Sequence, residues 1–459
     1  MSEAIPAVDS PRMPSGVAAP GIGLIMAIAV AVVVPLVLAL ALDEKFALLT
    51  VVAVVAPIGL YYVFKNPSIA VSVALISHTW SVELVGQYVT PFKIFGVVAL
   101  LVVARDVITR GRLRSVPRGF SYGMACLLGF VAVGELAAEY EGSISPFFEF
   151  GGTLIIFGLF TQTILSTADL RILSRIYTLN LVLTAASVWR EVGWSALGES
   201  GTRASGICGQ PNVLANHLAM SLPFALALLF DRAESFKWRA LAVIAILGSV
   251  YGEWGAASRG GTIGFACGLF AFAFLTPRRA SFRFSAMAVA IVIAGAFATI
   301  GPKSFDRVTD TFDSTNDLDA VASERALHAR ISSEMVPRHP FLGAGTTAFG
   351  YERSRYTGVL GGALHSSLLA VAVSYGVLAL ALYIMLQLSA VYVAARAIGA
   401  GPDRVFLAAL AASALAAITS GFSGTELFRA EQWSVVGLCH IAAMRHAMAL
   451  GTAPRGATG

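Results

Sequence analysis

The chain has 459 residues, of which 57% are hydrophobic and only 13% are charged, whereas about 25% of residues are charged in an ordinary soluble domain. Apolar blocks of about twenty residues, each long enough to cross a bilayer, fill most of the chain, which excludes a cytosolic enzyme, a secreted disulfide scaffold and a disordered regulator. The net charge of +5 indicates no nucleic-acid partner, because basic residues gather in the cytoplasmic loops of membrane proteins.

The sequence predicts an all-α, polytopic transmembrane bundle of about 12–14 helices, since backbone groups in lipid must be hydrogen-bonded internally. Residues 1–20 are predicted to be a disordered cytoplasmic tail, residues 21–448 a single transmembrane domain, and residues 449–459 a second cytoplasmic tail. The predicted spans are 21–42, 46–64, 68–86, 92–109, 120–138, 147–166, 172–189, 212–230, 240–256, 260–276, 284–301, 364–389, 405–420 and 433–448.

Lysine and arginine counts orient this bundle. With the N-terminus inside, the cytoplasmic segments hold about 19 of the 32 basic residues, and the short external loops hold about six. A further seven or so lie in one long external loop, residues 303–363. Both termini are therefore predicted to be cytoplasmic, and the long loop is predicted to be periplasmic.

The long loop 303–363 is predicted to be partly helical. A structureless loop of this length is unusual, and long loops tend to be functional. The pattern of Ser323–Val336 indicates an amphipathic helix with Ala326, Ile331 and Met335 on one side. Two prolines, Pro337 and Pro340, should end it, and the glycine-rich turn 341–345 follows.

Three residues at external helix ends are the strongest candidates for chemistry: Arg203 before span 212–230, Arg259 between spans 240–256 and 260–276, and His365 at the start of span 364–389. Each has a plain alternative interpretation. An arginine at a helix end often only anchors the interface, and a histidine beside serines can be part of a helix cap.

Together the three residues fit one kind of reaction. Arginine pairs with phosphate oxygens through its planar fork and stabilises charge on a departing diphosphate. A neutral imidazole can take the proton of an attacking hydroxyl. The trio is therefore predicted to serve a hydroxyl nucleophile and a diphosphate leaving group, with Arg203 and Arg259 on the diphosphate and His365 on the hydroxyl.

Other polar residues rank lower. The acidic pair Asp317 and Asp319 suggests a metal site, but it lies in a polar stretch and is better interpreted as a solvated segment. Glu83, Glu135 and Glu253 lie in or near spans, where ionisable groups are costly, and their partners are not predictable. The four cysteines lie apart, so neither a disulfide nor a metal cluster is predicted.

Several motifs resemble those of the O-antigen ligase and O-antigen polymerase (Wzy-like) superfamily. They are Ser258-Arg-Gly-Gly261, Arg338-His-Pro-Phe-Leu-Gly-Ala-Gly345 with Phe349, and His365-Ser-Ser-Leu368 followed by Tyr375-Gly376. The stretch Arg203–Asn212 and the tail segment Gly424–Phe428 are similar as well. Ser366 departs from the pattern, because the family usually has asparagine there.

The resemblance implies a membrane glycosyltransferase with a GT-C-like fold. Such an enzyme moves a glycan from undecaprenyl diphosphate to a glycan or lipid A-core acceptor at the periplasmic face of the bacterial inner membrane. It implies no cofactor and no metal, and it makes Arg203, Arg259 and His365 the essential residues. Arg338, His339, Ser366 and Tyr375 of the matching motifs are possible supporting residues.

Two alternatives stay open. A polymerase uses the same site with a second lipid-linked glycan as the acceptor, and the sequence does not separate it from a ligase. A glycolipid transporter or flippase belongs to another class. Transporters tend to have repeated halves with midplane binding groups, whereas no repeat is visible here and the candidate residues lie at the external face.

Overall fold

The computed structural model describes residues 61–80, 90–140, 142–164, 166–193, 203–276, 318–361, 364, 366–398, 404–421 and 429–449, without the side chains of Arg259, residues 318–325 and Ala449. The chain divides into two compact units, 1–66 and 67–459. All helices from α3 onward belong to the second unit. The predicted span 284–301, the span 21–42 and most of the span 46–64 lie outside the described residues, as does the tail 1–20.

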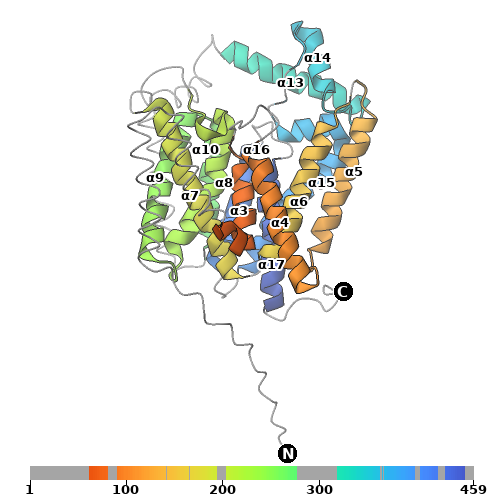
Figure 1. The fold of residues 1–459 in the computed structure, drawn as a ribbon. Helices are drawn as coiled ribbons and strands as arrows, with labels where there is room; N and C mark the ends of the chain where they lie inside the picture. Colours follow the sequence, from red (N-terminus) through yellow and green to blue (C-terminus); the bar gives the residue numbers. More distant parts are fainter. Residues whose placement is uncertain are drawn as a thin grey trace, which may run out of the picture. The chain divides into compact units, whose positions relative to one another are not determined.

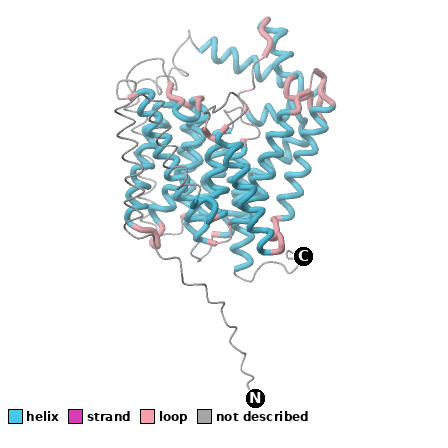
Figure 2. Tube along the Cα trace, in the orientation of Figure 1, coloured by secondary structure: helices cyan, strands magenta, loops and turns pink. Residues whose placement is uncertain are grey.

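The described elements are helical, and no strand occurs among them (Figure 2). They are α3 (Pro67–Ser77), α4 (Pro91–Arg110), α5 (Arg118–Leu136), α6 (Ser145–Thr163), α7 (Thr167–Val192), η2 (Gly206–Cys208), α8 (Pro211–Phe230), α9 (Phe236–Ala256), α10 (Arg259–Leu275), α13 (Leu318–Arg338), α14 (Ala348–Thr357), α15 (Ser367–Ala397), α16 (Arg404–Gly421) and α17 (Ala430–Ala449). The prediction of an all-α membrane bundle is confirmed. Most described spans agree with prediction to within a few residues, but α3 is much shorter than the predicted span 68–86.

Local sequence signals explain several of these boundaries. Ser166 and Asp169 form a capping box at the start of α7, which satisfies backbone N–H groups that the first helical turn leaves without partners. Gly111 ends α4 in the left-handed conformation, and its N–H donates to the carbonyls of Val107 and Ile108. Such glycine caps are a common way to end a helix.

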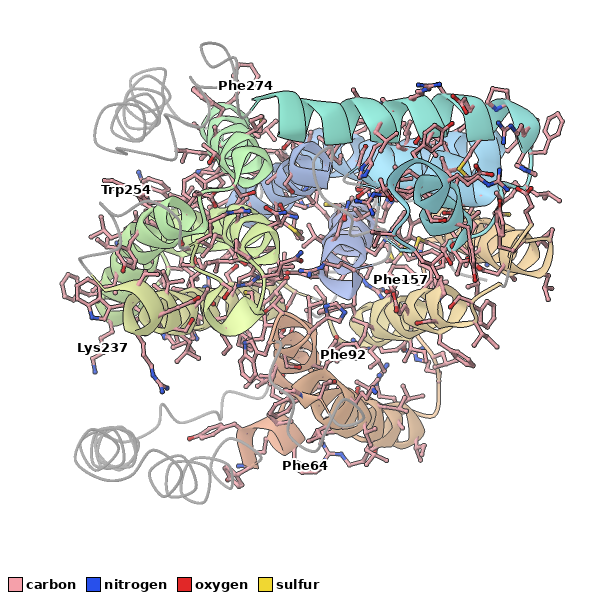
Figure 3. The ribbon with its side chains drawn as sticks, turned by 90° about the horizontal axis from the view of Figure 1, so that it is seen from above. Phe64, Phe92, Phe157, Lys237, Trp254 and Phe274 are labelled. Carbon is pink, nitrogen blue, oxygen red and sulfur yellow. The ribbon has the colours of Figure 1, made fainter. Side chains whose placement is uncertain are left out.

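Helix α8 lies in the middle of one group of helices. It packs against α7, α9, α10 and α16 (Figures 1 and 3), and almost all of its side chains from Val213 to Leu228 are buried. Five described helices, α5, α7, α8, α15 and α16, are long and apolar enough to cross a bilayer. The protein is therefore an integral membrane protein.

Helices α13 and α14 lie at one end of the bundle, and α13 runs across that end (Figures 1 and 3). Ile331 and Met335 are buried as predicted, in a cluster with Phe349 and Leu364. Ala326 was predicted on the same face but is exposed. It precedes Ile331 by five residues, which turns it away from a face that repeats every three or four residues.

The predicted stop at Pro337 is wrong. Helix α13 continues through Pro337 and ends at Arg338, two residues after the predicted end at Val336. The N–H of His339 still donates to the carbonyl of Met335 at 3.1 Å. Pro340 then follows the end of the helix as predicted.

Helix α15 differs most from its prediction as a single span, 364–389. It is sharply broken at Gly376, whose φ of 84° and ψ of 174° are not helical. The first half, 367–375, and the second half, 377–397, are folded so that Ser367 and Leu368 line the same cavity as Tyr383 and Ile384. The second half is about 32 Å long, enough to cross the hydrocarbon core by itself.

The glycine-rich loop 340–345 fills this break. The N–H groups of Ala344 and Gly345 donate to the carbonyls of Val373 and Ser374 at 2.8 and 3.1 Å, and the N–H of Val377 donates to Pro340 at 2.8 Å. The loop thus supplies backbone partners that the interrupted helix loses, as buried backbone groups require.

Candidate functional site

Arg203 is fixed against the end of helix α9. Its Nε donates to the carbonyl of Ala256 at 2.9 Å, and its Nη2 donates to the side-chain oxygen of Asn212 at 2.8 Å. The backbone N–H of the next residue, Ala204, donates to Gly255 at 2.8 Å. The carbonyl end of a helix carries partial negative charge, so this position suits a cation.

The turn from α9 to α10 meets the same asparagine. Ser258 caps α10, since its Oγ accepts from the N–H of Gly261, and the same hydroxyl donates to the side-chain oxygen of Asn212 at 3.1 Å. Arg259 is the first residue of α10. Asn212 therefore joins Arg203 to the turn that carries Arg259, although the Arg259 side chain is outside the described atoms.

Gly261 allows this turn to approach α8 closely. A Cβ atom at this position would lie 2.2 Å from the Cβ of Ala215 and 2.8 Å from Oε1 of Glu253. Glu253 is buried, and its Oε1 accepts from the hydroxyl of Thr262 at 3.3 Å. The structure thus gives Glu253 a partner that could not be predicted from the sequence. The partners of Glu135 are described below with Tyr375, and Glu83 lies outside the described residues.

The start of α15 carries the third candidate segment. His365 lies outside the described residues, but its neighbours do not. Leu364 is buried in the α13 cluster, Ser366 occupies the N-cap position of α15, and Ser367 is buried at its first turn. The backbone on both sides of His365 is thus anchored to described parts of the bundle.

Two cavities lie along α8, α16 and the start of α15. A small polar pocket is lined by Asn216, Met220, Ala417, Ser420, Gly421, Arg429, Glu431 and Gln432. Asn216 is one helical turn beyond Asn212 on α8. A larger, mainly apolar cavity of about 150 Å³ shares Gly421 and Gln432 with the polar pocket and also includes Ser367. The two cavities therefore meet at Gly421 and Gln432, and the larger one reaches Ser367 at the start of α15.

Arg338 and His339 contact carboxylates of α13, α14 and the loop after α5. Arg338 lies 3.7 Å from both Glu334 and Glu352, and His339 lies 3.0 Å from Glu139. Hydrogen bonds from Tyr356 and Arg330 hold the pKa of Glu334 below its usual value. In these contacts the two residues join α13 to α14 and to the loop after α5, and none of the contacts reaches Arg203.

Tyr375 lies in the break of α15 and is fully buried. Its hydroxyl donates to Oε1 of Glu135 at 3.1 Å, and Glu135 also accepts from the N–H groups of Thr346 and Ser143. These contacts hold the loop, α5 and α15 together. The predicted motif 338–345 with Tyr375-Gly376 is thus one packing unit next to the candidate site.

A buried polar chain was missed by the sequence reasoning. Trp80, Asn180, His217 and Glu431 are linked in that order by hydrogen bonds across four segments of the bundle. The available signal was His217, an ionisable residue in the middle of the apolar span 212–230, where such residues are rare and usually functional.

A metal site finds no support among the described residues, where no group of three His, Cys, Asp or Glu side chains is placed to hold an ion. Asp317 lies outside them, and of Asp319 only the backbone, in the first turn of α13, is described. Metal independence stays a prediction. The four cysteines are free.

Comparison with known families bears on this arrangement. Residues 240–384 match the family described as O-Antigen ligase. The match includes the Ser258-Arg259-Gly260 turn, loop 338–345 and the start of α15, so it confirms the resemblance found in the sequence. No curated protein matches the chain.

Proposed function

We propose that this O-antigen ligase-like protein is a glycosyltransferase that moves a glycan from undecaprenyl diphosphate to a sugar hydroxyl at the periplasmic face of the inner membrane. One observation carries the proposal. Asn212 accepts hydrogen bonds from both Arg203 and Ser258, which brings Arg203 next to the turn that bears Arg259. Two arginines at one helix junction suit a diphosphate with its two phosphoryl groups.

The proposed reaction is an inverting transfer. The acceptor hydroxyl oxygen attacks the anomeric carbon and forms the new glycosidic bond, while the bond from that carbon to the diphosphate oxygen breaks. The electron pair leaves on the diphosphate, where Arg203 and Arg259 stabilise the charge. His365 takes the hydroxyl proton on its neutral imidazole nitrogen. No metal or organic cofactor is needed for this balance.

The apolar cavity beside Ser367 supports a lipid-linked donor. Leu368, Ile384 and Leu388 line it, and Leu388 is also about half exposed on the outer surface of the bundle. An apolar space open at a bilayer-facing surface suits a polyprenyl chain, whose transfer from lipid costs little because both surroundings are apolar.

A strain that lacks this protein tests the proposed function and distinguishes a ligase from a polymerase. We expect that loss of this chain changes the surface glycan when it is resolved by size. Polymer missing from the lipid acceptor, with lipid-linked polymer accumulating, identifies a ligase. Single repeat units attached to the acceptor identify a polymerase, the alternative that uses the same site. An unchanged surface glycan would contradict both.

The periplasmic position of the site is testable through α13. Ser333 is exposed on that helix, so Ser333→Cys should react with a membrane-impermeant thiol reagent in cells whose outer membrane alone is permeabilised. Lys237→Cys, at the predicted cytoplasmic start of α9, is the matched control and should react only after the inner membrane is lysed. The reverse pattern would place the arginines in the cytoplasm and end the proposal.

A further inference from the structure

The buried chain that ends at Glu431 has a fixed direction. The indole N–H of Trp80 can only donate, so the atom of Asn180 that lies 2.8 Å from it is an oxygen acceptor. The amide nitrogen of Asn180 then faces Nε2 of His217 at 2.8 Å. An amide N–H donates, so Nε2 of His217 must accept and carries no proton.

The tautomer of His217 follows from this direction. A neutral imidazole without a proton on Nε2 carries it on Nδ1, and Nδ1 lies 2.7 Å from Oε1 of Glu431. His217 therefore donates to Glu431. The three side chains Asn180, His217 and Glu431 are all at most 2% exposed, so water does not compete with these bonds. Glu431 is held as a hydrogen-bond acceptor in one orientation.

Glu431 also lines the polar pocket between α8, α16 and the start of α17. The other polar side chains there include Asn216, Arg429 and Gln432. The pocket's free space is about 10 Å³, which suffices for about one water molecule. It is too small for a sugar ring but has room for a single hydroxyl group, which can donate to a carboxylate and accept from an amide or a guanidinium.

We propose that Glu431 binds one hydroxyl group of the acceptor sugar in this pocket. The inference rests on the proposed glycosyl transfer and adds a specificity residue to it. The pocket includes Asn216, one helical turn beyond Asn212 on α8, and it shares Gly421 and Gln432 with the cavity that Ser367 lines. A hydroxyl held there would belong to a sugar that enters beside Ser367, the second residue after His365 in the chain.

The decisive variant is Glu431→Gln. Glutamine keeps an oxygen that accepts from His217 but removes the negative charge, and hydrogen bonds to charged groups are the stronger ones. We expect the KM for the purified acceptor glycolipid to rise roughly tenfold or more, with kcat within about threefold of wild type and the KM for the lipid-linked donor unchanged.

Trp80→Phe is the matched control. It removes the donor at the far end of the chain and leaves Glu431 and the pocket lining in place, so it should lower the Tm without changing the KM for the acceptor. If Trp80→Phe raised the acceptor KM as much as Glu431→Gln, the effect would belong to the packing of the chain and the proposal would be wrong.

Three other results would overturn the inference. They are an unchanged acceptor KM in Glu431→Gln, a loss confined to kcat, and a rise in the KM for the donor instead. A wild-type protein that transfers no glycan at all would instead contradict the proposed function. The two failures are therefore distinguishable in the same assay.

Discussion

Purified Arg259→Lys protein should insert normally and transfer glycan at least tenfold more slowly than the wild type. Lysine keeps the charge but lacks the planar fork that pairs with two phosphate oxygens at once. Loss of one donor that stabilises developing charge typically costs on the order of 10²–10³ in rate. If Arg259 only anchors the start of α10, lysine should replace it without loss, because both side chains can reach the interface with their charge.

His365→Ala should be as slow or slower, because the acceptor hydroxyl then lacks its base. The assay is transfer from undecaprenyl-diphosphate donor by variants matched for expression and thermal stability. Arg330→Lys is the control, since Arg330 is an exposed arginine of α13 that pairs with Glu334. Turnover near that of the wild type in Arg259→Lys would favour the anchoring role and remove the main chemical support for the site.

The largest loss of stability is expected for Gly343→Ala. Gly343 has a φ of +70°, and an added Cβ would lie 2.2 Å from the carbonyl carbon of Ser374 and the nitrogen of Tyr375. These are backbone atoms in the break of α15 and cannot rotate away. The loop would have to leave the break, and its hydrogen bonds to Val373 and Ser374 would be lost. We expect a cost of about 3–5 kcal/mol.

Gly358→Ala separates strain from overlap in this experiment. Gly358 has nearly the same φ, +71°, but an added Cβ there would meet no atom within 4 Å. Its cost should be only about 1 kcal/mol, the strain of a left-handed alanine. The measurement is the Tm and the yield of monodisperse protein in detergent. Equal losses in the two variants would mean that loop 340–345 is not packed into the break as described.

Most helices were predictable because a long apolar run predicts a membrane-spanning helix by itself. The spans from α4 to α10 needed only hydropathy, which is a local signal. Helix α14 was not predicted, because its ten residues are mostly polar. It is held by contacts with distant segments: Tyr140 stacks on its Tyr351, and its Phe349 packs in the cluster with Ile331 and Met335.

The break at Gly376 was not predictable either, because it also depends on contacts with a distant segment. Neither a proline nor a polar run marks it, and a glycine in an apolar helix is more often a packing position. The break exists because Pro340, Ala344 and Gly345, some thirty residues earlier, supply its hydrogen-bond partners. Such a signal is shared between two segments and is visible in neither alone.

The candidate site was predictable to a similar extent. Lysine and arginine counts predicted external helix ends for Arg203 and the Ser258-Arg259 turn, and this stays a prediction. Their common partner Asn212 was known only as a neighbour of Arg203 in sequence. The direction of the chain from Trp80 to Glu431 required the contacts themselves. It depends on which atom of Asn180 faces an indole one hundred residues away.

The broken helix also bears on how the protein is made. As a continuous helix, the 31 residues of α15 would be about 47 Å long, well beyond a hydrocarbon core of about 30 Å. The loop that divides this helix precedes it in the chain and is synthesised first. Bending at Gly376 depends on hydrogen bonds with loop 340–345, so it is a step of tertiary folding. Without the docked loop, a continuous α15 would have to tilt strongly to fit the bilayer.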